Sequence, residues 1–316
     1  MTQPAVPADA APRLLVLGEA LIDVVRDVDG GVEEHVGGSP LNVALGLSRL
    51  GHPVDFATTI GQDARGERIT ALLDEGDVTL TQGSRTADPT STAQAQLDAT
   101  GAATYVFDLH FNLPPVPLAP GTGHAHTGSI GALLTPGEQN VRAALDEVRA
   151  QGTVSYDPNI RPSIMGSADE IRPHIEAIIA LSDVVKASSD DLDYLYPGDT
   201  AAAVMAHWCT LGAGLAVITL GAHGVTYRTA VSQDTAAAPT AAAHVVDTVG
   251  AGDSFMAGLV SGLLDLGYLG HPDARARLAG ATLEEVRPAI ERGLATSAVT
   301  VGRAGAYAPT RAEITA

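Results

Sequence analysis

Lysine and cysteine are almost absent from this sequence of 316 residues, which contains Lys186 and Cys209 as its single examples. One cysteine cannot form an internal disulfide, so a disulfide-stapled fold is excluded. A free thiol is typical of a reducing compartment, and we expect a cytoplasmic protein. Cys209 falls in a helical-looking run, 201–211, and is interpreted as a buried structural thiol rather than a nucleophile.

Positive charge is scarce in general, because 18 Lys and Arg residues face 37 Asp and Glu residues, for a formal net charge of −19. The basic residues are scattered and nearly all arginine, so nucleic acid is excluded as a partner. An acidic protein also repels a phosphate-bearing substrate. Such a substrate would have to be attracted locally, by a metal ion, by backbone N–H groups or by a few placed cations.

Long apolar runs are absent too. A membrane-spanning helix needs about 20 apolar residues in succession, and the most apolar segment, 255–266, is interrupted by Gly258 and Gly262. We therefore expect a soluble protein with no membrane partner. Residues 1–13 are rich in Ala and Pro, lack the pattern of a signal peptide and are predicted to be a flexible tail before one domain, 14–316.

Short apolar runs alternate with helical periods along the rest of the chain, which predicts an α/β fold with helices on the faces of an open sheet. Ser39 is predicted to be a helix N-cap with Pro40 at the first helical position. Capping boxes are predicted at 135–138 and 282–285. The predicted strands are 13–18, 54–60, 124–130, 153–156, 183–186 and 215–220.

One region departs from this alternation. Residues 91–97 and 103–109 alternate polar and apolar side chains around a turn, which predicts a β-hairpin. With an extended segment at about 20–36, the region at about 88–111 could form a small sheet that acts as a lid and excludes water. A surface hairpin without a role fits the pattern equally well. If it is a lid, residues such as Gln94, Gln96, Tyr105 and Phe107 would help to choose the substrate.

Small residues precede an apolar helix near the C-terminus. After a predicted strand at 243–246, the run Asp247 to Asp253 leads into a helix predicted to begin at Ser254. Glycines here allow backbone N–H groups to converge at a helix N-terminus, which is an anion site. The glycines alone could simply form a turn. Asp253 argues otherwise, because a carboxylate beside an anion site is better explained as a base that awaits a hydroxyl group.

Two motifs together resemble the ribokinase-like, or PfkB, carbohydrate kinases. Residues 247–258 (DTVGAGDSFMAG) resemble the C-terminal signature of that family, and residues 37–44 (GGSPLNVA) its N-terminal signature. The resemblance extends from Leu14 onward. It implies a three-layer α/β/α domain with a mostly parallel central sheet and a small β-sheet lid.

The resemblance implies a catalytic centre around Asp253, which would be the general base on a sugar hydroxyl. The amides of Gly250, Ala251, Gly252 and Asp253 would stabilise charge on the transferred phosphoryl group. Sugar hydroxyls would be bound by Asp23, Gly37, Gly38 and Asn42, because acceptors and amides on rigid elements suit a neutral polyol.

The run 157–161 (DPNIR) follows a buried-looking strand, and open α/β sheets bind ligands at the carboxyl ends of their strands. The guanidinium of Arg161 can hold a phosphate in bidentate fashion. A plain surface ion pair is the alternative for this residue. This run resembles the fructokinase branch of the family, as do residues 18–23 and 127–129.

The resemblance also implies the remaining ligand sites. ATP would lie against Lys186, Ser188, Thr219, Gly221 and Gly224, together with Gly250 and Gly252. Residues 186–191 depart from the Asn-x-x-Glu pattern common in the family, which limits Asp191 to a water-mediated role toward Mg²⁺. A monovalent cation, usually K⁺ in the family, would bind to Asp247, Val249, Ala298 and Val301. His124 and His126 share a strand face but lack a third ligand.

The function implied is ATP-dependent phosphorylation of a primary hydroxyl of a sugar, with fructose favoured as the acceptor and fructose 6-phosphate as the product. Ribose, 2-keto-3-deoxygluconate and nucleosides stay open as acceptors. A different class of protein, a sugar-binding regulator without catalysis, would be expected to have lost the base or the glycines, and both are present. Lids of this kind can pair in dimers, so we expect a homodimer.

Overall fold

The computed structural model describes residues 11–26, 31–97, 103–240 and 244–315. The helices are α1 (Ser39–Arg49), α2 (Ala64–Glu75), α3 (Glu138–Arg149), α4 (Pro162–Met165), α5 (Ala168–Ile179), α6 (Ser189–Leu195), α7 (Ala201–Leu211), α8 (Ala251–Asp265), α9 (Ala274–Ala279), α10 (Leu283–Val301) and α11 (Arg311–Ile314), with 3₁₀ turns η1 (Ile130–Ala132) and η2 (Gly221–His223). The strands are β1 (Arg13–Leu17), β2 (Leu21–Arg26), β3 (Val32–Gly37), β4 (Val54–Ala57), β5 (Ile60–Gly61), β6 (Val78–Leu80), β7 (Arg85–Thr86), β8 (Thr92–Leu97), β9 (Ala103–Asp108), β10 (Thr122–Gly128), β11 (Thr153–Asp157), β12 (Val184–Ser188), β13 (Leu215–Thr219), β14 (Val225–Thr229) and β15 (Ala236–Ala238).

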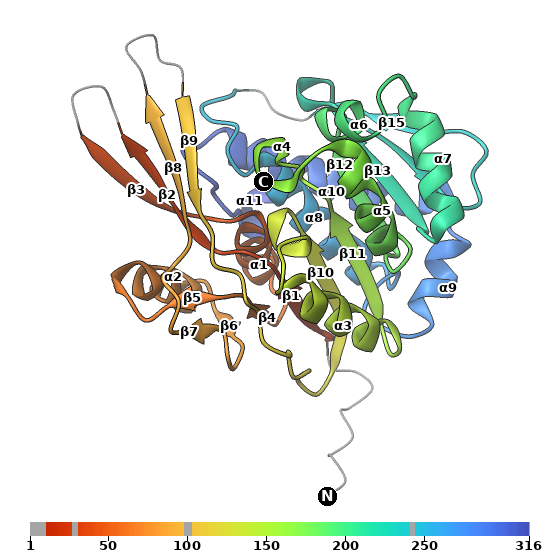
Figure 1. The fold of residues 1–316 in the computed structure, drawn as a ribbon. Coiled ribbons are helices and arrows are strands. Elements are labelled where there is room, and N and C mark those ends of the chain that lie inside the picture. The colour runs from red at the N-terminus through yellow and green to blue at the C-terminus, as the bar shows by residue number, and fades with distance from the viewer. Residues whose placement is uncertain (1–10, 27–30, 98–102, 241–243, 316) are drawn as a thin grey trace, which may run out of the picture.

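The central sheet runs through the middle of the molecule (Figure 1). In the described residues it has nine strands in the order β15-β14-β13-β12-β11-β10-β1-β4-β6. All neighbours are parallel except at β14, which is antiparallel to β13 and β15. Successive side chains of β1 point to opposite faces, so Leu14 joins a core with α1, α8 and α10, while Leu15 joins a core with α3, α5 and α7. The predicted three-layer α/β/α architecture is confirmed.

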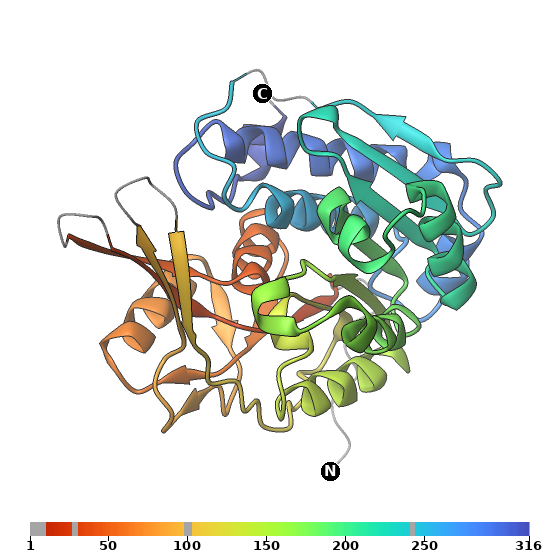
Figure 2. The same cartoon turned by 45° about the horizontal axis from the view of Figure 1, so that its top comes forward.

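A separate sheet projects from this body as the sequence predicts (Figures 1 and 2). Its strand order is β3-β2-β8-β9, with β2 parallel to β8 and the other pairs antiparallel. The predicted hairpin is β8 and β9. The described part covers the side chains of Gln94 and Phe107, whereas the predictions for Gln96 and Tyr105 lie outside it. We call this sheet the lid sheet.

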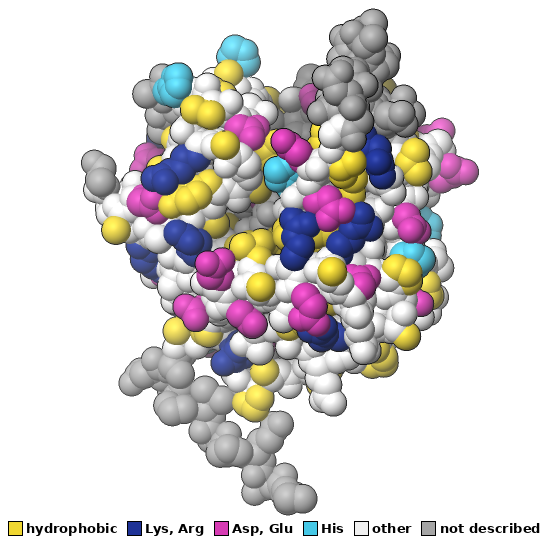
Figure 3. All heavy atoms as spheres, turned by 90° about the vertical axis from the view of Figure 1, so that its left-hand side faces the viewer, with side chains coloured by type: hydrophobic (Ala, Val, Ile, Leu, Met, Phe, Trp, Pro, Cys, Tyr) yellow, Lys and Arg dark blue, Asp and Glu magenta, His cyan; other side chains and the backbone are white. Residues whose placement is uncertain are grey.

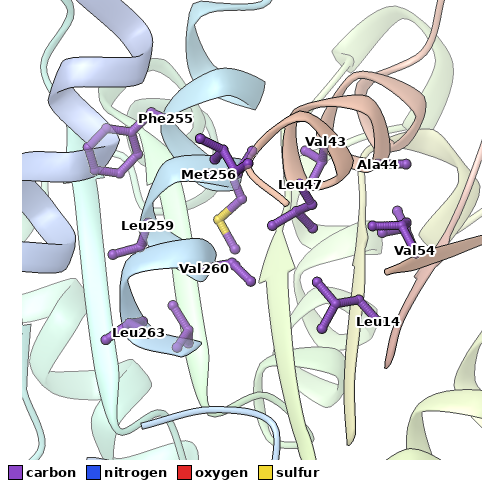
Figure 4. Close-up of a cluster of buried hydrophobic side chains, with 14 of the residues drawn as sticks. Leu14, Val43, Ala44, Leu47, Val54, Phe255, Met256, Leu259, Val260 and Leu263 are labelled. Carbon is purple, nitrogen blue, oxygen red and sulfur yellow. The ribbon is translucent and has the colours of Figure 1, made fainter. Parts of the chain in front are cut away.

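Helices α1 and α8 pack side by side in the layer that covers one face of the central sheet. Figure 4 shows Leu47 of α1 facing Met256 and Val260 of α8, with Leu14 of β1 below them. All four side chains are fully buried. Gly46 permits this close approach, because a Cβ there would lie 2.7 Å from the Cβ of Ala257. The packing fixes the first turn of α8 against the first turn of α1, and both signature motifs lie there.

Several local predictions were wrong. Helix α1 begins at Ser39 with Gly38 as its N-cap, because the Ser39 hydroxyl bonds across to another helix instead of capping its own. The Thr135 capping box does not form, since α3 begins only at Glu138. The box at Thr282 and Glu285 is confirmed. Helix α8 begins at Ala251 rather than Ser254, which places Asp253 inside the first turn.

Two further predicted strands have different outcomes. The strand predicted at 13–18 is confirmed as β1, in which Arg13 donates to Asp55 at 2.7 Å, while residues 1–10 of the predicted tail lie outside the described part. Residues 244–246 form no strand, and 243 lies outside the described residues. The exposed valines Val245 and Val246 are 57% and 55% accessible, so an apolar run here did not mean a buried strand.

None of the described helices is both long and apolar enough to cross a bilayer. On the face that carries the lid sheet, basic and acidic side chains are interspersed, with hydrophobic side chains between them (Figure 3).

Candidate active site

The predicted site residues lie at one edge of the central sheet. Ser188 and Thr219 end two neighbouring strands and are paired in register, as are Gly128 and Asp157. Parallel strands end at a common edge, which is where open α/β sheets bind ligands. The turn before α8 and the base of the lid sheet close over the same edge (Figure 2).

Asp253 lies in the first turn of α8 and is 9% exposed. Its Oδ1 accepts a hydrogen bond from the Ser39 hydroxyl at 2.6 Å, and its Oδ2 accepts one from the Asn42 side-chain amide at 2.8 Å. An ionised carboxylate offers about four lone-pair positions, so each oxygen can accept a further donor. Two fixed donors therefore orient the carboxylate without using up its capacity to accept a proton.

Ser39 is a contact that sequence reasoning missed, and Asn42 has a partner that was not expected. The side-chain amide of Asn42 is directed at the carboxylate of Asp253, and its predicted contact with the sugar stays a prediction. The signal was available in the serine and the asparagine three residues apart, since positions i and i+3 share a helix face. The first turn of α1 therefore directs two hydrogen-bond donors, from Ser39 and Asn42, at the carboxylate of Asp253.

Replacement of Asn42 by alanine should lower kcat about tenfold, because a hydrogen bond to a charged group contributes about 1.5–3 kcal/mol and about 1.4 kcal/mol corresponds to a tenfold rate change. Steady-state kinetics with a saturating sugar acceptor would measure it. The matched control is Asn140→Ala, which removes an amide donor to the Leu113 carbonyl far from this edge. An equal loss of kcat in both variants would contradict a specific role for Asn42.

The predicted anion site is formed by the turn that leads into α8. Gly250 has φ of 73°, and the amide of Ala251 donates back to the Thr248 carbonyl at 3.2 Å. Within the described residues, the amides of Gly252 and Asp253 donate no backbone hydrogen bond. Free N–H groups at a helix N-terminus, with the positive end of the helix dipole, favour a bound anion.

The predicted sugar-binding residues Asp23, Gly37 and Gly38 lie where the lid sheet meets α1. A Cβ on Gly37 would fall 2.1 Å from the Asp23 carboxylate, and a Cβ on Gly38 would fall 2.5 Å from the Glu19 carbonyl. Gly38 is therefore required for close approach to backbone and also has φ of 120°, whereas a side chain at Gly37 would displace the Asp23 carboxylate. Burial raises the pKa of Asp23, while His35 and Arg161 lower it.

Glu19 is a second residue that sequence reasoning missed. It is 5% exposed, and its Oε2 accepts a hydrogen bond from the Gly131 amide at 2.8 Å. Burial raises the pKa of Glu19 to about 7, against opposing hydrogen bonds and the charge of Arg161. The charge of Arg161 thus acts on both Glu19 and Asp23, so this exposed arginine lies near the predicted sugar-binding residue Asp23. A role toward phosphate remains a prediction.

Lys186 is buried at the same edge. Its Nζ donates to Asp157 Oδ2 at 2.7 Å, and the two side chains are only 5% and 1% exposed. Asp157, in the DPNIR run, was not predicted as a site residue. The sequence contained only a weak signal for the pair, because β11 and β12 had to be placed side by side before the two charges could be seen to meet.

Ser188 and Asp191 hold local structure. Ser188 caps α6, and Asp191 Oδ2 accepts from the Ser188 amide at 2.8 Å and hydroxyl at 2.7 Å. Asp191 Oδ1 accepts from the Ile160 amide at 2.7 Å. With these three donors Asp191 fixes the DPNIR loop. The water-mediated role toward Mg²⁺ stays a prediction, and direct ligation does not fit this arrangement.

The predicted nucleotide-side residues lie one strand further along the sheet. Thr219 ends β13, Gly221 begins the turn η2 with φ of 56°, and Gly224 follows that turn with φ of 84°. A Cβ on Gly224 would lie 2.1 Å from the Ala238 carbonyl, whereas Gly221 faces open space. The exposed backbone at Gly221 is free for close approach of a ligand.

The residues predicted for a monovalent cation also come together. Asp247 Oδ1 accepts from the Val249 amide at 3.0 Å, and Oδ2 accepts from the Gly305 amide at 2.8 Å. The Val301 carbonyl accepts from the Asp247 amide at 3.2 Å, and Ala298 lies in the same last turn of α10. Backbone hydrogen bonds lower the pKa of Asp247. No group of three His, Cys, Asp or Glu side chains suited to a metal occurs in the described part.

Comparison with known proteins gives consistent matches. The family model described as pfkB family carbohydrate kinase matches residues 11–313. A fructokinase of Rhizobium leguminosarum bv. trifolii is 35% identical over 263 residues, covering 79% of this chain and 79% of that protein. The structure of a fructokinase of Xylella fastidiosa with bound ATP has a TM-score of 0.82 at 25% identity, over 97% of this chain and 98% of that one. A fructokinase double mutant of Vibrio cholerae O395, in a form with fructose, ADP and potassium bound, has a TM-score of 0.76 at 23% identity, over 98% and 99% of the two chains.

Proposed function

Because this chain belongs to the pfkB family of carbohydrate kinases, we propose that it transfers the γ-phosphoryl group of ATP to the primary 6-hydroxyl of fructose. The products are fructose 6-phosphate and ADP. The fructokinase at 35% identity supports fructose as the acceptor. The observation that carries the proposal is Asp253, held by Ser39 and Asn42 in the first turn of α8, beside free amides.

The proposed chemistry needs one base and one anion site. Asp253 accepts the proton of the sugar hydroxyl as that oxygen forms its bond to the γ-phosphorus, and the bond from that phosphorus to the ADP oxygen breaks. The amides of Gly252 and Asp253 donate to the phosphoryl oxygens. Asp23 and the backbone at Gly38 receive the other sugar hydroxyls, while the lid sheet limits the access of water.

Cations complete the proposal. Mg²⁺ would neutralise charge on the ATP phosphates, and it commonly keeps several waters and binds through substrate phosphates rather than a protein cage. Asp191 would then act only through water. K⁺ fits the carboxylate of Asp247 and the carbonyls of Val249, Ala298 and Val301, because such oxygen donors suit hard cations and carbonyls have a second lone pair. Bound there, it would hold the turn that carries Gly250.

ATP would lie along the edge from the α8 turn to Thr219, Gly221 and Gly224, with Ser188 beneath it.

We further propose a cytoplasmic homodimer. The lone cysteine supports a reducing compartment. Exposed apolar side chains on the edge strands of the lid sheet, Val32 at 48% and Val106 at 58%, support pairing through that sheet.

A coupled ADP-release assay tests the acceptor. The panel is fructose, ribose, 2-keto-3-deoxygluconate, tagatose, glucose and adenosine, each with and without K⁺. We expect kcat/KM for fructose to exceed that for every other acceptor by at least ~10-fold, because a site that pairs several hydroxyls discriminates against misplaced ones. A higher kcat/KM for ribose or 2-keto-3-deoxygluconate would replace fructose as the acceptor, and no turnover with any of them would overturn the proposed function.

A further inference from the structure

The single lysine of this chain lies in an unusual place. Lys186 is 4% exposed in the middle of β12, paired with Asp157 at 2.7 Å. Burial of an ion pair is costly, because the loss of hydration is offset only by excellent geometry and further hydrogen bonds. That geometry is incomplete here, since Asp157 Oδ1 is buried and has no hydrogen-bond partner in the described structure. A pair retained only for stability would not be expected to leave a carboxylate oxygen unpaired.

The ammonium also lies against the first turn of α8. A Cβ built on Gly252 would be 3.0 Å from Lys186 Nζ. The N-terminus of a helix carries about half a positive charge, so the ammonium adds to the positive potential already present there. The ammonium and the helix N-terminus repel each other when nothing is bound between them. An anion bound between them would be attracted by both.

Acidic groups hold the ammonium in its charged form. Although burial lowers the pKa of Lys186, Asp157, Asp253 and Asp191 together raise it above its ordinary value. Burial and the charge of Lys186 together lower the pKa of His126 to about 3, so His126 is neutral. Burial raises the pKa of Asp157 to about 6, which leaves it ionised at neutral pH. The fixed positive charge at this point is therefore Lys186.

We propose that Lys186, held in place by Asp157, stabilises the negative charge of the phosphoryl group while it is transferred at the N-terminus of α8. This role rests on the proposed kinase function and gives Lys186, predicted only as a nucleotide contact, a part in the transfer step. Asp157 is then a positioning residue, which keeps the ammonium beside Gly252. Lys186 is the only lysine of the chain, so this site holds the one ammonium side chain that an acidic protein presents to a phosphate.

A double-mutant cycle separates this role from structural support. Lys186→Gln removes the charge of the lysine, Asp157→Asn removes that of its partner, and the combined variant keeps two polar side chains of similar size. The control cycle is Arg275→Gln with Asp183→Asn, a second ion pair joined at 2.9 Å, in which Asp183 is buried just before the start of β12 and Arg275 is partly exposed. Each variant is measured for Tm, for kcat and for the KM of ATP and sugar.

We expect the combined Lys186→Gln and Asp157→Asn variant to lose about 10²-fold in kcat, the effect of removing one donor to a developing anion. The KM of the sugar should change by less than about threefold. Asp157→Asn alone should lose less than Lys186→Gln alone, because it leaves the ammonium in place. A purely structural pair would instead lower Tm with little change in kcat, as we expect for the control cycle.

The pH dependence of kcat/KM is a second readout, and it can be measured even if one variant is less stable. The charged groups that interact with Asp253 are Lys186 on β12 and Asp157 on β11, and Asp191 on α6 acts on both of these, while α1 contributes the neutral Ser39 and Asn42. Lys186→Gln should move the acid limb of kcat/KM to higher pH and Asp157→Asn to lower pH. Unchanged limbs together with a kcat within about threefold of wild type in the combined variant would overturn the role of Lys186. The kinase function would stand in that case, since it fails only if the wild-type protein phosphorylates no sugar.

Discussion

Asp253→Asn should lower kcat by at least about 10²-fold, the usual loss when a general base is removed, while the dissociation constants of sugar and ATP change little. Asparagine has the same shape as aspartate, so the helix turn and the free amides at residues 252 and 253 stay in place. It cannot accept a proton from the sugar hydroxyl. Quenched-flow turnover measures kcat, and calorimetric titration with each substrate measures the dissociation constants.

The control for this variant is Asp265→Asn on the same helix. Asp265 lies at the far end of α8, where it pairs with Arg292 and Arg311, each at 2.6 Å. This change should lower Tm, because two arginines lose their charged partner, and it should leave kcat near the wild-type value. Near-normal turnover in Asp253→Asn, or an equal loss in Asp265→Asn, would remove Asp253 from the role of base.

Gly250→Ala should have the second-largest effect, with a loss of about 10²-fold in kcat, comparable to removal of an oxyanion-site donor. Gly250 has φ of 73°, which costs other residues about 1–2 kcal/mol. In addition, a Cβ there would lie 2.7 Å from the Cα of Ala306 and 2.5 Å from its Cβ. Backbone cannot move aside as a flexible side chain can. The turn must therefore shift, and the amides of the α8 N-terminus shift with it.

Gly198→Ala separates backbone strain from this clash. Gly198 has φ of 89°, and within the described residues nothing lies within 4 Å of a Cβ built there. It should lower Tm through the unfavourable φ alone and leave kcat unchanged. The expected pattern is a decrease in Tm in both variants and a loss of kcat in one. Normal kcat in Gly250→Ala would show that the position of these amides is not critical.

The sequence predicted those parts of the site that lie in contiguous motifs. The run 247–258 identifies Asp253 and its helix because turn, base and helix are consecutive, and the run 37–44 identifies the helix opposite it. The three-layer fold followed from the alternation of apolar strands and amphipathic helices. Such patterns depend on local spacing, which a single sequence contains.

The parts that the sequence did not predict depend on tertiary placement. Ser39 looked like an N-cap because its residue type and position suit one, yet Asp253, 214 positions away, takes its hydroxyl. Asp157 and Lys186 are 29 positions apart and meet only because β11 and β12 are neighbours. Glu19 and Gly131 meet through the contact of the β1 and β10 ends. Pairwise contacts of this kind leave no periodic signal.

The most direct measurement of the central claim is a single-turnover experiment with γ-labelled ATP, fructose and an excess of enzyme, in which the labelled product is identified. We predict that the label appears on the 6-hydroxyl of fructose with the wild-type protein, and that Asp253→Asn forms the same product at least about 10²-fold more slowly. Label that appears only as inorganic phosphate, or equal rates in the two proteins, would contradict the account.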